Sequence, residues 1–209
     1  GYIARMKAAV QALGHGEEAL EVIILQLVNL IRGGEQVRMS KRTGSFISMR
    51  ELIDEVGTDA ARFFFLMRSP DSHLDFDIDL AQQQTADNPV YYVQYAHARI
   101  CSILRQVPEL PSPETIDPGL LTTEHEINLM RHLAAFPAEV ELAAEKREPH
   151  RIAHYAQEVA ALFHSFYTHC RVIGEDQKLQ DARLTLTRCV GIVLANALEL
   201  LGVRAPESM

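Results

Sequence analysis

The chain has 209 residues, an apolar content of 47% and a formal net charge of −8. A chain of this length and composition can bury a substantial core, as one large domain or as two small ones. The negative charge excludes a protein that coats nucleic acid through a uniformly basic surface. The distribution of the charges along the chain therefore matters more than their sum.

The cysteines and the N-terminal residues indicate the compartment. Cys101, Cys170 and Cys189 are far apart and form no Cys-x-x-Cys pair, so they predict neither a disulfide framework nor a zinc ribbon. No apolar run approaches the roughly 18 residues of a membrane span, and the start has no signal-peptide layout. The sequence lacks an initiator methionine, which indicates a fragment or a processed chain. We expect a cytoplasmic protein without membrane contact.

The first elements predicted along the chain are a short helix and two strands. The helix is expected over residues 8–13, and the nearly continuous apolar run over residues 20–31 is typical of a buried, parallel strand. The glycine pair 33–34 turns the chain, so residues 35–38 are expected to return as a second strand. This hairpin would open on its far side into a polar loop, residues 39–46.

Two helices are expected after this loop. Ser48 and Glu51 form the capping-box pattern of a helix that extends to Val56. A second helix starts at Thr58 and extends to Met67, a few residues before the next proline. The first half of the chain therefore mixes strand and helix patterns.

The second half of the chain predicts helices only. Asn88 followed by Pro89 is a helix start, and this helix is expected to extend to about Val107. The last helix is apolar on most sides, which places it at the centre of a bundle. The change of pattern divides the chain into a mixed domain, residues 1–87, and a helical bundle, residues 88–209. Further helix signals follow a proline-rich linker. Thr123 and Glu126 form a capping box, Pro137 starts or kinks a helix, Pro149 begins another, and Gly202 ends the last one.

The polar loop carries a motif with a chemical meaning. Its residues Arg38-Met39-Ser40-Lys41-Arg42 resemble the second signature of class I aminoacyl-tRNA synthetases, Lys-Met-Ser-Lys-Ser. The match departs at its two ends, where arginines replace the first lysine and the last serine. A mobile loop with ammonium and hydroxyl donors can neutralise the charge that builds on the phosphates of ATP as pyrophosphate leaves.

Other segments resemble arginyl-tRNA synthetases in particular. Residues 59–66 and 72–77 look like the segment that joins the catalytic domain of this family to its anticodon domain. Residues 88–99 are similar to the opening helix of the anticodon-binding domain. Residues 163–172 and 200–209 agree as well, so the resemblance covers essentially the whole chain. The first class I signature, His-x-Gly-His, does not occur in the chain.

The resemblance implies a mostly α fold, with the C-terminal end of a class I Rossmann-type α/β catalytic domain followed by an all-helical anticodon-binding bundle. The implied activity is ATP-dependent ligation of arginine to its tRNA, with Mg²⁺ as the counter-ion of ATP and no structural metal. We expect a monomer with ATP, arginine and arginine tRNAs as partners, and an inactive isolated chain. The residues expected at ATP are Val37, Arg38, Met39, Ser40 and Lys41, with Ser40 and Lys41 as the catalytic ones.

The helix that starts at residue 89 predicts a face for RNA. Tyr92, Tyr95 and Arg99 follow one another at spacings of three and four, so they project from one side of a helix. Unpaired anticodon bases stack on aromatic rings, and an arginine reaches a phosphate or a base edge. The resemblance places tRNA contacts at these three positions, and further contacts at Tyr167 and Met209.

Several alternatives stay open. Tyr92 and Tyr95 could instead be core aromatics of the bundle, although the same helix has a separate apolar set. The chain could also be a non-catalytic helical module that binds tRNA or protein, or a purely structural bundle. His150 and His154 have a metal-binding spacing, but no third ligand is near in sequence and we expect both to face solvent.

Overall fold

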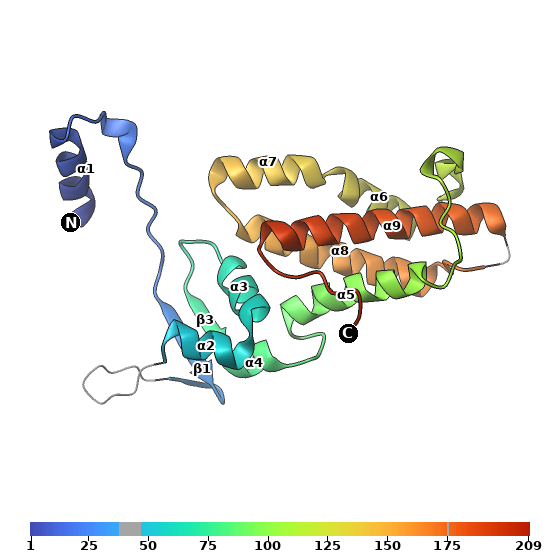
Figure 1. Cartoon of the computed structure of the whole chain (residues 1–209), viewed down its shortest axis with the longest axis horizontal. Coiled ribbons are helices and arrows are strands. Elements are labelled where there is room, and N and C mark those ends of the chain that lie inside the picture. Colours follow the sequence, from blue (N-terminus) through green and yellow to red (C-terminus); the bar gives the residue numbers. More distant parts are fainter. Residues whose placement is uncertain (38–46, 175) are drawn as a thin grey trace.

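The computed structural model describes residues 1–37, 47–174 and 176–209. Figure 1 shows a bundle of long helices, a smaller group of strands and short helices beside it, and one helix set apart near the N-terminus. The described part of the chain is mostly helical with one small sheet, as predicted. Within it, every helix is too short or too polar to cross a membrane.

The sheet consists of β1 (Val28–Arg32), β2 (Glu35–Gln36) and β3 (Leu74–Asp77), in the order β2-β1-β3. β1 pairs antiparallel with β2, which confirms the predicted hairpin, and parallel with β3. The turn requires its glycines, because Gly33 and Gly34 have φ angles of +60° and +77°, which L side chains rarely adopt.

The prediction of a strand over residues 20–31 was wrong for most of its length. Among the described residues, only the part from Val28 onward pairs with other strands, and Leu27 is 83% exposed just before it. A buried strand needs a neighbouring strand to accept and donate its backbone hydrogen bonds. In the run before Val28, the described backbone hydrogen bond to a distant segment is the one from the N–H of Gln26 to the carbonyl of Pro70.

The first helix is longer than predicted. α1 (Tyr2–Ala12) begins six residues before the expected start at residue 8, because no proline or glycine interrupts this stretch. It buries no residue of its own, and the 3₁₀ turn η1 (Glu17–Ala19) follows it. Figure 1 shows both elements away from the bundle.

Two of the short helices beside the sheet follow their predicted signals. Ser48 caps α2 (Met49–Val56) in a complete capping box with Glu51, as predicted. α3 (Thr58–Leu66) starts directly after Gly57, and α4 (Ile78–Gln82) is capped by Asp77. The predicted sequence signals therefore match the starts of α2 and α3, whereas α4 was not predicted.

The bundle contains α5 (Pro89–Leu104), α6 (Glu124–Ala134), α7 (Phe136–Lys146), α8 (His150–His169) and α9 (Gln177–Leu200). α5 ends three residues before the expected Val107. The proline-rich linker forms two 3₁₀ turns, η2 (Pro113–Thr115) and η3 (Pro118–Leu120). α9 packs against α5, α6 and α8, which agrees with its predicted central place.

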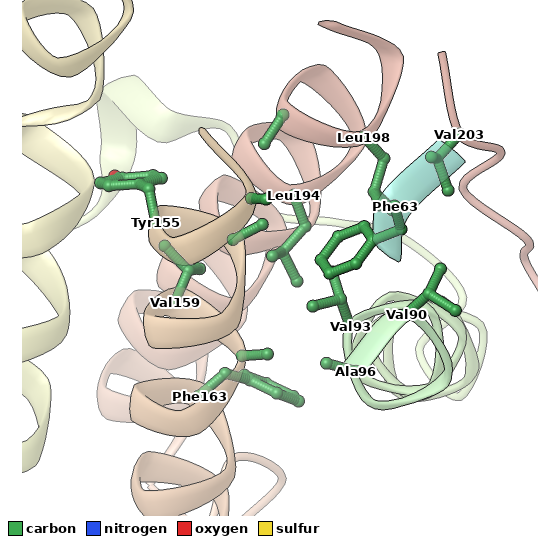
Figure 2. Close-up of a cluster of buried hydrophobic side chains, with 14 of the residues drawn as sticks. Phe63, Val90, Val93, Ala96, Tyr155, Val159, Phe163, Leu194, Leu198 and Val203 are labelled. Carbon is green, nitrogen blue, oxygen red and sulfur yellow. The ribbon is translucent and has the colours of Figure 1, made fainter. Parts of the chain in front are cut away.

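Phe63 joins the group around the sheet to the bundle. It extends from α3 and is completely buried near Val93 of α5, Leu194 and Leu198 of α9, and Val203 (Figure 2). Burial of such a ring stabilises the contact by about 2–3 kcal/mol. α3, from the first of the two proposed domains, therefore packs against helices of the second. The division at residue 87 stays a proposal.

Candidate nucleic-acid interface

The cap of α5 fixes the direction of the helix that carries the predicted RNA face. The side-chain oxygen of Asn88 accepts from the backbone N–H of Val90 at 3.2 Å. Its Nδ2 donates to the carbonyls of Ala81 and Gln83 at 3.1 and 2.7 Å. Asn88 is buried, so its bonds tie the start of α5 to the end of α4.

Apolar residues and tyrosines lie on different faces of α5. Tyr95 is 38% exposed, whereas Tyr92 is half-buried and packs against the core. Burial raises the pKa of Tyr92. The alternative that both tyrosines are core residues therefore fits Tyr92 in part and does not fit Tyr95. The core side of the helix is formed by the separate apolar set Val90, Val93, Ala96 and Ile100.

Arg99 lies between two tyrosines. Its Nη1 donates to the hydroxyl of Tyr95 at 3.1 Å, and its Cζ lies 4.7 Å from the ring centroid of Tyr167 on α8. Desolvation opposes the charge of Arg99, but the hydroxyls of Tyr167 and Tyr95 outweigh it and raise its pKa above the usual value. The guanidinium is therefore held, charged, over an aromatic face.

Three adjoining hollows surround this group. A cavity of about 330 Å³ is lined by Arg99, Arg105 and Tyr167 together with Ser208 and Met209, among others. A second cavity, of about 410 Å³, continues beyond Tyr167 to the end of α8. A third, of about 440 Å³, lies on the other side of Tyr95. The structure thus brings together Tyr92, Tyr95, Arg99, Tyr167 and Met209, and we call the surface formed by these five residues the α5/α8 face.

His164 lies beside the α5/α8 face but was not predicted there. Its ring centroid lies 5.0 Å from that of Tyr92 and 6.1 Å from that of Tyr95, and it lines the third cavity. Burial, and then the nearby charge of Arg99, lower the pKa of His164, which favours the neutral ring. Its position three residues before Tyr167 on one helix was the sequence signal that could have revealed it.

Met209 reaches the α5/α8 face through an extended segment, residues 203–209, which we call the tail. Val203 is buried at its start, and Arg204 forms an ion pair with Asp59 at 2.9 Å. The tail then follows α5, where Arg105 donates to the carbonyl of Glu207 at 2.9 Å. Residues more than 100 positions apart in sequence therefore form one wall of the first cavity.

The predicted ATP loop lies mostly outside the described residues. Arg38, Met39, Ser40 and Lys41 are among the residues that the structure does not describe, whereas Val37 donates its backbone N–H to the carbonyl of Leu30 at 2.8 Å. The backbone N–H of Gly33 donates to Asp79 at 2.6 Å.

An ion pair between the end of β1 and α2 supports the hairpin. Arg32 donates to both oxygens of Glu55 at 2.8 and 2.6 Å. The chain before the loop is thus fixed by the hairpin, and the chain after it by the cap of α2.

The histidine pair with metal-binding spacing lies elsewhere. His150 and His154 line a cavity of about 390 Å³ that also includes His132 and Glu158, beside α7. In the described part of the chain, however, no three such side chains gather in a metal-binding arrangement. These residues are on a different part of the bundle from Arg99 and do not form part of the α5/α8 face.

Comparison with known proteins first assigns a class. The family described as the DALR anticodon binding domain matches residues 93–209. This match covers more than half of the chain and includes Tyr95, Arg99, Tyr167 and Met209. The chain therefore belongs to the family of DALR anticodon binding domains.

The relatives within that class are arginine–tRNA ligases, which confirms the resemblance. The chain is 59% identical to the enzyme of Desulforamulus reducens and 56% identical to that of Heliobacterium modesticaldum. All of this chain is matched in each case, but it spans only 38% of the length of these relatives.

Solved structures give the same result. The structure of a putative arginyl-tRNA synthetase from Campylobacter jejuni is 34% identical, with a TM-score of 0.86 over 100% of this chain and 45% of that chain. Arginyl-tRNA synthetase from Thermus thermophilus is 28% identical, with a TM-score of 0.71 over 86% of this chain and 34% of that chain.

Proposed function

We propose that this chain is the part of an arginine–tRNA ligase that binds the tRNA anticodon on the α5/α8 face. The relatives are ligases that join arginine to tRNA, and the family match is an anticodon-binding domain. The observation that carries the assignment to this face is Arg99, held between the hydroxyl of Tyr95 and the ring of Tyr167 beside an open cavity.

The chemistry of this face suits single-stranded RNA. Tyr95 presents an exposed ring on which an unpaired base can stack, a contact that contributes about 1–3 kcal/mol. The guanidinium of Arg99 remains charged and can neutralise a phosphate or donate to a base edge. No acidic residue occurs in the stretch 88–108, so the surface of α5 does not repel the RNA backbone. Tyr92, Tyr167 and Met209 would complete the contacts.

Binding of an arginine tRNA transcript by the Tyr95→Ala and Arg99→Ala variants tests this proposal. Both are expected to bind at least about tenfold more weakly at fixed salt, with melting temperatures close to that of the original chain. Arg99→Ala is also expected to reduce the slope of log K against log salt by about one, because one phosphate contact is lost. A large loss of stability with unchanged affinity would make the face part of the core.

We further propose that residues 37–41 contact ATP in the full-length enzyme. Lys41 and Ser40 would act at the phosphates, while Val37, Arg38 and Met39 would line the nucleotide. The support is the signature-like sequence between a fixed hairpin and a capped helix. Mg²⁺ would accompany the ATP phosphates as their counter-ion.

The whole enzyme would ligate arginine to tRNA in the cytoplasm, as a monomer. The alternative, a non-catalytic helical module that binds tRNA, predicts that Lys41 is dispensable for every activity of the full-length protein. Kinetics of the full-length enzyme with Lys41 replaced therefore distinguish the two functions.

A further inference from the structure

Two buried polar side chains on α5 contact the tail. Gln94 and His97 are only 9% and 8% exposed. Gln94 Nε2 donates to the carbonyl of Arg204 at 2.9 Å, and His97 Nδ1 lies 2.9 Å from the carbonyl of Pro206. A carbonyl can only accept, so His97 must carry its proton on Nδ1 in this contact.

The packing of α5 does not itself require polar residues at these positions. The neighbouring Val93, Ala96 and Ile100 are completely buried and apolar. A buried amide or imidazole costs free energy unless its polar atoms are hydrogen-bonded. Apart from Asp59, which accepts from Gln94 at 3.1 Å, the described hydrogen-bond partners of these two side chains from other elements are backbone carbonyls of the tail.

The tail needs such contacts if Met209 is to form part of a binding site. Val203 is its last buried residue, and six residues then lead to Met209, which is 56% exposed. A flexible segment of six residues has a root-mean-square end-to-end distance of about 13 Å, so a free tail would leave Met209 spread over a region wider than one base. The bonds from Gln94 and His97 hold the backbone on the way.

We propose that Gln94 and His97 are positioning residues for RNA binding, which hold the tail along α5 so that Met209 forms a wall of the cavity beside Arg99. The proposal rests on the proposed function of the α5/α8 face and adds to it two residues that need not touch RNA. Because both contacts go to backbone carbonyls, they set the path of the tail without depending on its side chains.

A double-mutant cycle separates this role from a purely structural one. The probe is an arginine-tRNA anticodon stem-loop, and its affinity is measured for Gln94→Ala and His97→Ala in the 209-residue chain and in a chain that lacks residues 205–209. In the longer chain each substitution is expected to weaken binding by at least about fivefold, the effect of one net hydrogen bond. In the shortened chain the same substitutions are expected to leave affinity unchanged.

Two controls complete the experiment. His97→Asn can place an amide N–H where Nδ1–H lies, so it is expected to recover most of the affinity. Thr187→Ala removes a buried hydroxyl whose described hydrogen bond lies within α9, to the carbonyl of Arg183 at 2.8 Å. It is expected to lower the melting temperature and leave affinity unchanged.

Two outcomes would overturn the inference. Equal losses of affinity in the two chain lengths would show that Gln94 and His97 act through the bundle and not through the tail. No loss in either chain would show that the path of the tail is irrelevant to RNA. In both cases binding by the unsubstituted chain would persist, whereas failure of the proposed function would abolish binding of the stem-loop altogether.

Discussion

Glu126 is a completely buried carboxylate at the start of α6. It accepts from the backbone N–H of Thr123 at 2.8 Å and from Nε of Arg183 on α9 at 2.7 Å. Burial opposes its charge, but the hydrogen bonds from Thr123 and Arg183 outweigh it and lower the pKa. One residue thus caps a helix, as the sequence predicted, and also fixes α6 against α9, which the sequence did not predict.

We expect Glu126→Gln to destabilise the chain by about 3 kcal/mol, because it leaves the largely buried guanidinium of Arg183 without its counter-charge. A carboxylate with a lowered pKa contributes stability above its ordinary value of 4.5 and loses it as pH falls through the folded-state pKa. Urea unfolding at pH 7 and at pH 3 is therefore expected to show a smaller difference between variant and original chain at the lower pH. A difference that does not change with pH would contradict this account.

At the scale of the element, the end of α9 depends on one glycine. Gly202 has a φ of +65°, and a Cβ at this position would lie 2.6 to 2.8 Å from the guanidinium atoms of Arg62. Arg62 in turn donates to the carbonyl of Leu201 at 3.0 Å, which joins α3 to the end of α9. The tail begins at the next residue.

Gly202→Ala is expected to cost about 1–2 kcal/mol, from the left-handed backbone and from displacement of Arg62. Differential scanning calorimetry is expected to show a lower melting temperature. Gly174→Ala is the matched control, since a Cβ there meets none of the other described residues within 4 Å and its φ is not in the left-handed region. A Gly202→Ala variant as stable as this control would mean that the end of α9 tolerates a side chain.

The signature-like loop is the second element with a testable role. In the full-length enzyme, Lys41→Ala is expected to lower kcat by roughly a hundredfold or more, because a charge-stabilising donor contributes about 3 kcal/mol in the transition state. The affinity for ATP in the ground state is expected to change less. If Lys41→Ala retains normal turnover while Arg38→Ala abolishes it, the catalytic role belongs to Arg38.

At the scale of the whole molecule, the chain spans 38% of the length of its curated relatives. It contains no His-x-Gly-His motif. Most of the positioning that amino acid activation requires would come from that motif and from an arginine pocket. We therefore expect the purified chain to catalyse no arginine-dependent exchange of pyrophosphate into ATP, and measurable exchange would contradict this expectation.

The sequence predicted local features better than contacts between elements. The caps at Ser48, Asn88 and Thr123 were predicted correctly, because a cap depends on a few neighbouring residues. The apolar run before Val28 was misread, since an apolar pattern does not reveal whether a strand has neighbours to pair with. α1 is also longer than expected. It covers Tyr2–Ala12 and not residues 8–13, because the residues before the expected start have sufficient helix propensity.

The α5/α8 face was predicted in part for the same reason. The spacing of Tyr92, Tyr95 and Arg99 on one helix is local and was visible in the sequence. The contact of Arg99 with the ring of Tyr167 and the path of the tail along α5 join distant residues, and only the folded chain shows them. Tyr92 turned out half-buried because α8 places His164 against its ring.

Discrimination between two RNAs tests the central claim most directly. The affinity of the 209-residue chain is measured at one salt concentration for an arginine-tRNA anticodon stem-loop and for the same stem-loop with its anticodon bases replaced. If the α5/α8 face binds the anticodon, replacement is expected to weaken binding by about tenfold or more, and Arg99→Ala is expected to remove most of that difference. Equal affinity for the two stem-loops would contradict the account.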